Sequence, residues 1–265
     1  PQAGSDVAGL TCTARRDGDV FVVNGNKKWI TNGTYADYHV VLAETGGRGK
    51  LTFLVVDKDT PGFSTRKIEI RGSDISGTAY LDFDNVRVPS SNVIGEVDDG
   101  FKISMYNFNH ERFYVSVCAC RLSRVCIEES IKWAMKREAF GKPLANLQSI
   151  RLKIARMGRE VELLQNWLEQ IAYQMTTMSH AEAQLKISDI MCNCKAYASV
   201  VYEKVARETT MVLGGNALRA GGVGEIVEGA VAQVKGYQIP AGAENVMEDF
   251  AGRTAFKLAS RFAKL

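Results

Sequence analysis

A charged pair interrupts the apolar side of a predicted helix in the stretch FNHERF, residues 108–113. The positions at helical spacing from Glu111 are all apolar or small: Phe108, Val115, Cys118, Leu122 and Val125. A carboxylate on such a face costs free energy unless it is paired, protonated or used in chemistry. Glu111 and the adjacent Arg112 therefore have two interpretations, a buried ion pair that joins helices or a catalytic carboxylate. On the helix alone, the ion pair is the simpler one.

Other common catalytic signatures are absent from the sequence. No Gly-x-Gly-x-x-Gly turn, Walker loop or Gly-x-Ser-x-Gly elbow occurs. The histidines His39, His110 and His180 are scattered, and four of the six cysteines form two Cys-x-Cys pairs in helical stretches. This spacing is typical of small buried thiols, and we expect no metal site.

The composition is that of an ordinary globular protein. The chain has 265 residues, of which 46% are hydrophobic and 24% charged, enough for one large or two modest domains. A net charge of +3 is too small to indicate a nucleic-acid partner. No apolar run is long enough for membrane insertion.

Residues 1–97 are predicted to form a β-domain. The segment 20–30 reads as a strand, an Asn24-Gly25 turn and a second strand. YHVVLAET, KLTFLVVD, STRKIEI and TAYLDFDNVRV read as further strands. Many short strands joined by turns predict an antiparallel β-barrel or sandwich.

Residues 98–265 are predicted to form a helical bundle, so the fold class is α+β. We expect helices from about residue 101, over 149–177, over 181–213 up to Gly214-Gly215, and over 224–236 and 244–262. Gly141 and Pro143 interrupt the helical pattern. The long helices are expected to pack antiparallel as a four-helix bundle.

Both ends of the chain are informative. The sequence begins at Pro1 inside a loop-like stretch, which indicates a fragment or a processed chain. The terminal Ala263-Lys264-Leu265 is similar to the Ser-Lys-Leu peroxisomal signal. A helix end that happens to finish in Lys-Leu is the alternative, and the mitochondrial matrix is then the expected location.

Five motifs in order give the whole chain a resemblance to a known family: AGSDVAG, KKWITNG, DNVRVPSSNVIGE, REAFGKPL and VLGGNA. Together they resemble the acyl-CoA dehydrogenase family. The resemblance implies a middle β-domain, a C-terminal four-helix bundle and the absence of the family's N-terminal helical domain. It also implies FAD as cofactor, an acyl-CoA substrate, a role in fatty acid β-oxidation, and a homodimer or homotetramer.

The resemblance assigns cofactor roles to several residues. Trp29 packs against the flavin, and Thr31, two residues along a strand and therefore on the same face, bonds near its N5 edge. Arg137 faces the pyrophosphate of a neighbouring subunit's FAD and Phe140 packs on that cofactor. Gly214 and Gly215 let the backbone approach the adenine-ribose end. Two neighbours depart from the pattern, because Met211 replaces a Gln and Ala217 replaces a Gly.

The same resemblance identifies the base by elimination between two positions. In much of the family a Tyr-Glu-Gly-Thr segment carries it, but here Ala241 stands at the Glu position, before Gly242. The isovaleryl-CoA and long-chain branches place the base immediately before an Arg in the first long helix, which is Glu111. Glu244 is expected to belong to the next helix start.

Glu111 is thus expected to remove the α-proton of the thioester, and burial to raise its pKa. The backbone N–H of Ala241 is expected to hold the thioester oxygen. Ser5, Asn109, Arg112 and Gly242 are assigned to substrate binding.

Three functions remain open from the sequence. The first is an FAD-dependent acyl-CoA dehydrogenase that passes electrons to a flavoprotein, or to oxygen as an oxidase. The second is a DNA-binding flavoprotein relative, which the small net charge does not favour. The third is a catalytically silent or inactive fragment of a longer enzyme.

Overall fold

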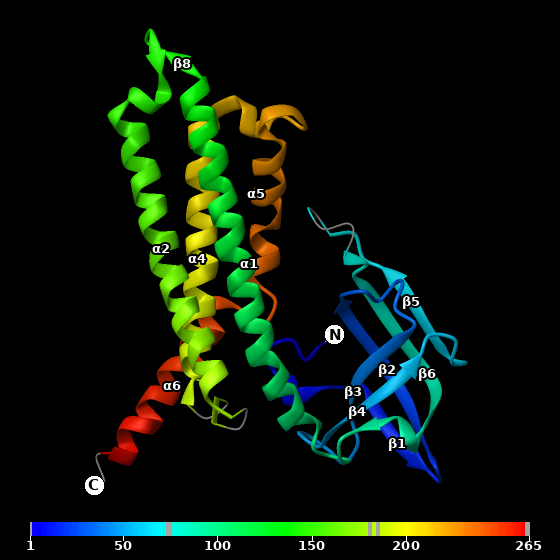
Figure 1. Ribbon diagram of the computed structural model, residues 1–265. Coiled ribbons are helices and arrows are strands. Elements are labelled where there is room, and N and C mark those ends of the chain that lie inside the picture. Colours follow the sequence, from blue (N-terminus) through cyan, green and yellow to red (C-terminus); the bar gives the residue numbers. More distant parts are fainter. Residues whose placement is uncertain (1, 71, 73–75, 180–181, 184–185, 263–265) are drawn as a thin grey trace. The chain divides into compact units, whose positions relative to one another are not determined.

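The computed structural model describes residues 2–70, 72, 76–179, 182–183 and 186–262, and two compact units, Pro1–Asn107 and Phe108–Leu265, divide the chain (Figure 1). The predicted boundary at 97/98 falls shortly before this division. Pro1, His180 and the terminal Ala263-Lys264-Leu265 lie outside the described residues.

The first unit is built on a sheet with the strand order β5-β6-β2-β1-β3-β4-β7. Its strands are β1 (Thr13–Asp17), β2 (Val20–Ile30), β3 (Tyr38–Glu44), β4 (Leu51–Asp57), β5 (Phe63–Lys67), β6 (Ala79–Pro89) and β7 (Val93–Ile94). Alternate residues of β3 and β6 are buried, which produces the core around Phe21, Val41, Leu54 and Leu81. The predicted β-domain is confirmed.

The sheet differs in two respects from the prediction, which was an antiparallel barrel or sandwich. β1 and β3 pair in parallel at Thr13 and Glu44, so the sheet is mixed. β5 and β7 are the two ends of the order, and within the described residues the sheet does not close into a barrel. The alternation of apolar residues indicates one buried face and does not reveal whether the outer strands meet.

The predicted turn at Asn24-Gly25 is wrong, because β2 continues through it to Ile30. The register against β6 shifts between Val23 and Gly25, as at a β-bulge. Gly25 has φ +121°, and a Cβ there would lie 2.9 Å from the Cα of Cys12. Glycine is therefore needed for a bulge and a close backbone approach, and not for a hairpin turn.

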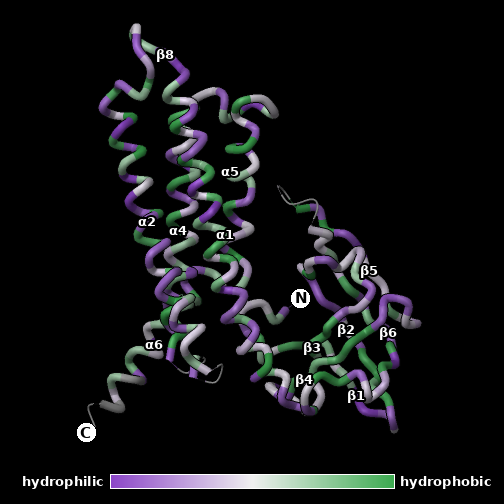
Figure 2. Tube along the Cα trace, in the orientation of Figure 1, coloured by the Kyte–Doolittle hydropathy of each residue, from purple (hydrophilic) through white to green (hydrophobic). Residues whose placement is uncertain are grey.

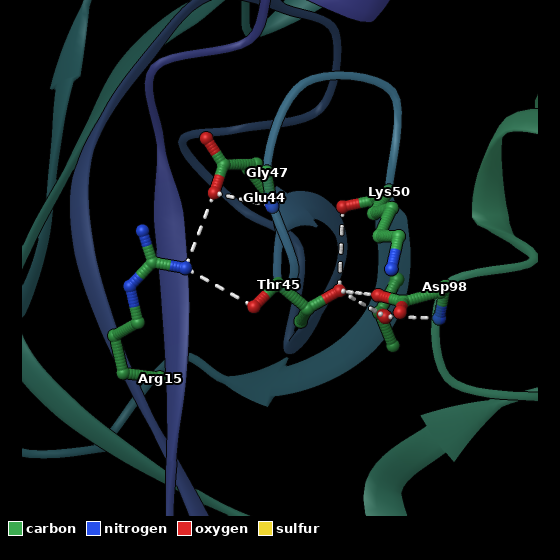
Figure 3. Close-up of polar contacts among 7 residues, drawn as sticks. Arg15, Glu44, Thr45, Gly47, Lys50 and Asp98 are labelled. Carbon is green, nitrogen blue, oxygen red and sulfur yellow. Dashed lines mark hydrogen bonds and ion pairs between the residues drawn. The ribbon is translucent and has the colours of Figure 1, made fainter.

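A polar network fixes the segment that leads into the first helix (Figure 3). The Arg15 guanidinium donates to the Glu44 carboxylate at 3.1 Å and to the Thr45 carbonyl at 3.1 Å. The Thr45 hydroxyl donates to the Asp98 carboxylate at 2.6 Å, and the Asp98 backbone N–H donates to the Thr52 hydroxyl at 2.9 Å. Asp98 is held in the left-handed region by these contacts, with φ +71°.

The long helix α1 (Gly100–Lys136) begins in the first unit, and the helical unit contains the rest of it. The unit also contains α2 (Gln148–Thr177), α4 (Ser188–Leu213), α5 (Glu225–Gln238) and α6 (Glu244–Phe262). Helices α1, α2, α4 and α5 form the predicted bundle, with polar and apolar residues interleaved along each helix (Figure 2). In the predicted helix 181–213, the described residues 182–183 and 186 are helical, Ile187 is a bend, and α4 begins at Ser188.

Small residues line the side of α1 that faces the bundle. Ala119, Cys120, Ser123 and Cys126 are at most 2% exposed and face α2 and α4 residues such as Leu164. Small side chains let helices approach closely, and the buried serine hydroxyls bond to carbonyls one turn back. All six cysteines are free thiols. The described residues form no cluster suited to a metal ion, and no described helix is long and apolar enough to cross a membrane.

Candidate active site

The turn between α5 and α6 has an unusual backbone. Ala241 lies in the left-handed region with φ +58°, and Gly242 follows with φ +115°. A Cβ at Gly242 would lie 2.3 Å from the Cε of Met247, so this position requires glycine for space as well as for conformation. Among the described residues, no acceptor takes the backbone N–H of Ala241.

Arg112 connects α1 to this turn. Its Nε donates to the carbonyl oxygen of Ala241 at 3.2 Å, and its Nη1 donates to Oδ1 of Asn109 at 3.0 Å. Asn109 is 4% exposed, and the ring of Phe108 lies 5.7 Å from the guanidinium carbon. The structure therefore brings together residues predicted from two separate segments, Asn109 and Arg112 from one and Ala241 from the other.

Glu111 directly precedes Arg112 in α1. Its side chain is exposed, and not buried on a core face as predicted. The residues at helical spacing from it, such as Val115 and Leu122, are half-buried. The buried side of α1 is rotated from them and carries Ser116 and Ser123. Serine does not register as apolar in a periodicity count, which is why the sequence pattern placed the core face beside its true position.

Lys195 of α4 is a residue that the sequence analysis missed. Its side chain is fully buried, and its Nζ donates to the carbonyl oxygens of Gln238 and Gly242, each at 2.6 Å. Burial lowers the pKa of this ammonium group to about 8; Glu244 nearby raises it and Arg112 lowers it further. The only sequence signal is a lysine within the otherwise small and apolar run CNCKAYASVV.

A second group of predicted residues lies at the other end of the bundle. The strands β8 (Glu138–Ala139) and β9 (Lys142–Pro143) form a hairpin between α1 and α2, visible at the tip of the bundle in Figure 1. Phe140 and Gly141 make its turn with φ +54° and +72°, and Phe140 is 90% exposed. Arg137 is also exposed.

The C-terminal end of α4 lies at the same end of the bundle as the β8–β9 hairpin. Leu213 and Ala217 pack with Val227, and Trp133 and Ile150 pack against them from α1 and α2. Gly214 ends α4 with φ +60°, and a Cβ at Gly214 or Gly215 would meet no described atom within 4 Å.

The two residues that depart from the family pattern in this segment differ in their exposure to solvent. Met211 is 63% exposed, whereas Ala217 is buried. Gly224, which was not predicted, has no space for a side chain, because a Cβ there would lie 1.9 Å from the carbonyl oxygen of Asn216.

In the sheet unit, Trp29 is 59% exposed and has φ +67°, with the Lys28 ammonium 4.5 Å from its ring centre. The β2–β6 register shifts between Lys27 and Ile30, and Thr31 follows the end of the strand. Strand alternation therefore does not place Trp29 and Thr31 on one face, and that reasoning was wrong. Ser5 is exposed in the turn before the short 3-10 helix Val7–Gly9.

Backbone strain distinguishes three of the predicted residues. The described non-glycine residues with positive φ include Asn32, Asn85 and Asp98, whose short polar side chains tolerate this region. The others are Trp29, Phe140 and Ala241, which do not belong to the tolerant types. Strained residues of this kind persist where surrounding structure holds them and gather at functional sites.

Comparisons with known proteins match both parts of the chain. The acyl-CoA dehydrogenase middle domain matches residues 1–86, and the acyl-CoA dehydrogenase C-terminal domain matches residues 98–256. The chain is 40% identical over 263 residues to acyl-CoA dehydrogenase apdG of Emericella nidulans, with 97% of this chain and 60% of that protein covered. It is 36% identical to acyl-CoA dehydrogenase AFT10-1 of Alternaria alternata, covering 95% of this chain and 59% of that one.

Solved structures give the same result. A probable acyl-CoA dehydrogenase from Mycobacterium abscessus superimposes with a TM-score of 0.90 at 31% identity, covering 96% of this chain and 66% of that chain. Butyryl-CoA dehydrogenase from Megasphaera elsdenii superimposes with a TM-score of 0.87 at 28% identity, covering 97% of this chain and 66% of that chain. The chain spans about three fifths of the length of the Emericella nidulans and Alternaria alternata proteins.

Proposed function

The chain belongs to the acyl-CoA dehydrogenase family, and we propose that it carries the chemistry of an FAD-dependent acyl-CoA dehydrogenase. The observation that carries the proposal is the strained trio Trp29, Phe140 and Ala241. Each stands at a position that the family resemblance assigns to the flavin or to the thioester.

The described residues fit FAD in each unit. Trp29 in the sheet unit offers an exposed indole for stacking, with Thr31 next but one along the chain as a hydrogen-bonding side chain. In the helical unit, Arg137 offers a guanidinium fork for a pyrophosphate and Phe140 an exposed ring. Bound FAD supplies the acceptor for the hydride that leaves the β-carbon of the acyl chain.

The helical unit supplies the residues for the proton step. Glu111 takes the α-proton of the acyl thioester onto its carboxylate, and loss of this proton together with the β-hydride leaves an α,β-unsaturated thioester. The negative charge that builds on the thioester oxygen is held by the backbone N–H of Ala241. Arg112 fixes the Ala241 carbonyl, and its position beside Glu111 in α1 supports a role for both residues in one site.

The two ends of the bundle support a homo-oligomer. From Arg112 to Lys136, α1 extends about 36 Å at the rise of an α-helix, which is longer than an extended dinucleotide. Residues at the hairpin end and at the Ala241 turn of one chain therefore serve different cofactor molecules. In a homodimer or homotetramer, Arg137 and Phe140 would complete the cofactor site of a neighbouring copy.

Electrons from the reduced cofactor go to a partner flavoprotein or to oxygen. One solved structure that the chain resembles, at 28% identity and a TM-score of 0.88, is described as an electron transferring flavoprotein of Acidaminococcus fermentans, which supports the first acceptor. Reoxidation of the substrate-reduced protein by an electron-transferring flavoprotein, compared with air-saturated buffer, separates the two.

The test is flavin reduction by acyl-CoAs of graded chain length without oxygen. We expect the visible flavin band of the purified protein to bleach with one chain-length class. Glu111→Gln should keep the flavin and lose the bleaching. The matched control is Glu128→Gln, which removes another exposed carboxylate of α1, paired with Arg121, and should bleach like the wild type.

Two results would contradict this proposal. Wild-type bleaching by Glu111→Gln would remove Glu111 from the reaction. A flavin band that no acyl-CoA bleaches would contradict dehydrogenation and favour a silent or DNA-binding relative.

A further inference from the structure

One face of α4 holds the end of α5 and the turn that follows it. Lys195, Ser199 and Glu203 are four residues apart and therefore lie on the same side of the helix. The Ser199 hydroxyl shares its proton between the Lys195 carbonyl at 3.0 Å and the Tyr237 carbonyl at 3.3 Å, and Glu203 accepts from the Gln238 side-chain amide at 2.7 Å. Lys195 extends this row of contacts to the two carbonyls of Gln238 and Gly242.

Lys195 is unusual among these residues because its charge is fully buried. Its two hydrogen bonds go to neutral backbone carbonyls, and the nearby Arg112 adds repulsion. A buried ammonium group with such partners is costly. What it gives in return is two directed hydrogen bonds to the backbone of the turn, which an apolar side chain cannot make.

The carbonyls that Lys195 binds bracket Ala241 in the chain. Arg112 takes the carbonyl of Ala241 itself, so three cationic hydrogen bonds fix the carbonyls of residues 238, 241 and 242. The Ala241 N–H lies in the peptide plane that joins Pro240 to Ala241, and the held carbonyls belong to peptide planes on both sides of it, so they limit its rotation and keep Ala241 in its left-handed conformation. Its N–H is then presented in one fixed direction.

We propose that Lys195 is a positioning residue that holds the Gln238–Gly242 turn so that the Ala241 N–H meets the thioester oxygen. This inference rests on the proposed acyl-CoA dehydrogenase function. Lys195 touches neither substrate nor cofactor in this account and acts only through the turn.

The test uses ligands that differ in the oxygen that Ala241 would hold. A 2-enoyl-CoA has the thioester carbonyl and does not reduce the flavin, whereas an S-alkyl-CoA thioether of equal length lacks the carbonyl. Their dissociation constants are measured from changes in the flavin spectrum. Lys195→Met keeps about the same side-chain volume and removes the ammonium group with both of its hydrogen bonds. It should weaken enoyl-CoA binding on the order of tenfold and leave thioether binding unchanged.

The control is Lys204→Met, which removes a half-exposed α4 ammonium group paired with Glu160 at 2.5 Å. It should keep the wild-type preference for the thioester. Equal loss of affinity for both ligands in Lys195→Met, or no loss for either, would overturn the positioning role. If the wild type binds neither ligand, the failure lies with the proposed function.

A second variant covers the case in which Lys195→Met does not fold with its flavin. Lys195→Gln has no buried charge and keeps one amide group that can donate to one of the two carbonyls. We expect a preference for the thioester between those of the wild type and Lys195→Met, and flavin reduction by substrate slowed in proportion. A wild-type preference in Lys195→Gln would contradict the proposal.

Discussion

The Nε of Arg112 donates to the carbonyl oxygen of Ala241 at 3.2 Å, across 129 residues of sequence. This hydrogen bond joins the early part of α1 to the turn between α5 and α6. It explains how the sequence positions proposed for the base and for the thioester contact are brought into one helical unit. It also makes the turn sensitive to the shape of the side chain at position 112.

Arg112→Lys tests whether that shape matters. A lysine keeps the charge but has no planar fork, so it cannot bond to both Asn109 and Ala241 in the observed geometry. We expect substrate-dependent flavin reduction to slow by about tenfold or more, with flavin content unchanged. Stopped-flow absorbance measures the rate. Arg121→Lys, at an exposed ion pair of the same helix, should react like the wild type.

Helix positions were predictable because their signals are local and repeat over many residues. The predicted helix 244–262 coincides with α6, and the helix predicted from residue 149 differs from α2 by one residue at its start. The resemblance to a family added the Ala241-Gly242 pair, which no periodicity indicates. The predictions of these helices and of this pair each rest on residues that are close together in the sequence.

The errors arose where distant segments decide the structure. Gly25 forms a bulge because Cys12 approaches its backbone, and no local pattern announces that contact. Trp29 has a left-handed backbone conformation at a register shift. The side chains of Trp29 and Thr31 therefore do not follow the strand alternation from which they were predicted to share one face. The partners of Lys195 lie 43 and 47 residues further along the chain, so a lone lysine in an apolar run gave no prediction.

Gly242→Ala is expected to destabilise the helical unit. The new Cβ would lie 2.3 Å from the Cε of Met247, and the alanine would have to adopt the φ of +115°. We expect the free energy of unfolding to fall by roughly 1–3 kcal/mol in urea titrations, from strain at this backbone position. Gly229→Ala in α5, where a Cβ meets no described atom, should be neutral or slightly stabilising. Met247 is itself buried, so the coupling is read from a double-mutant cycle: Gly242→Ala should cost less in a Met247→Ala background than in the wild type, unless strain alone is responsible.

Lys195 should give the stability a specific pH dependence. Its pKa is about 8 in the folded protein and has its ordinary value of 10.5 when the chain unfolds. Between these values the unfolded chain binds more protons, so stability rises with pH, by roughly 3 kcal/mol over the whole window. Urea titrations from pH 7 to pH 10 should show this rise in the wild type relative to Lys195→Met. Parallel curves would mean that the ammonium group is not destabilised by burial.

Phe140→Asn should separate stability from cofactor binding. Phe140 and Gly141 form a two-residue hairpin turn with both φ values positive, and Asn-Gly is a favoured pair for such a turn. We expect thermal stability to stay level or rise by the equivalent of about 0.5–1 kcal/mol, because asparagine tolerates this backbone better than phenylalanine. Flavin content after dialysis should fall, since the exposed ring is lost. Tyr173→Asn, at an exposed aromatic residue of α2, is the control and should keep its flavin. Full flavin retention by Phe140→Asn would show that the ring of Phe140 does not contact the cofactor, and the strain at this residue would then need another explanation.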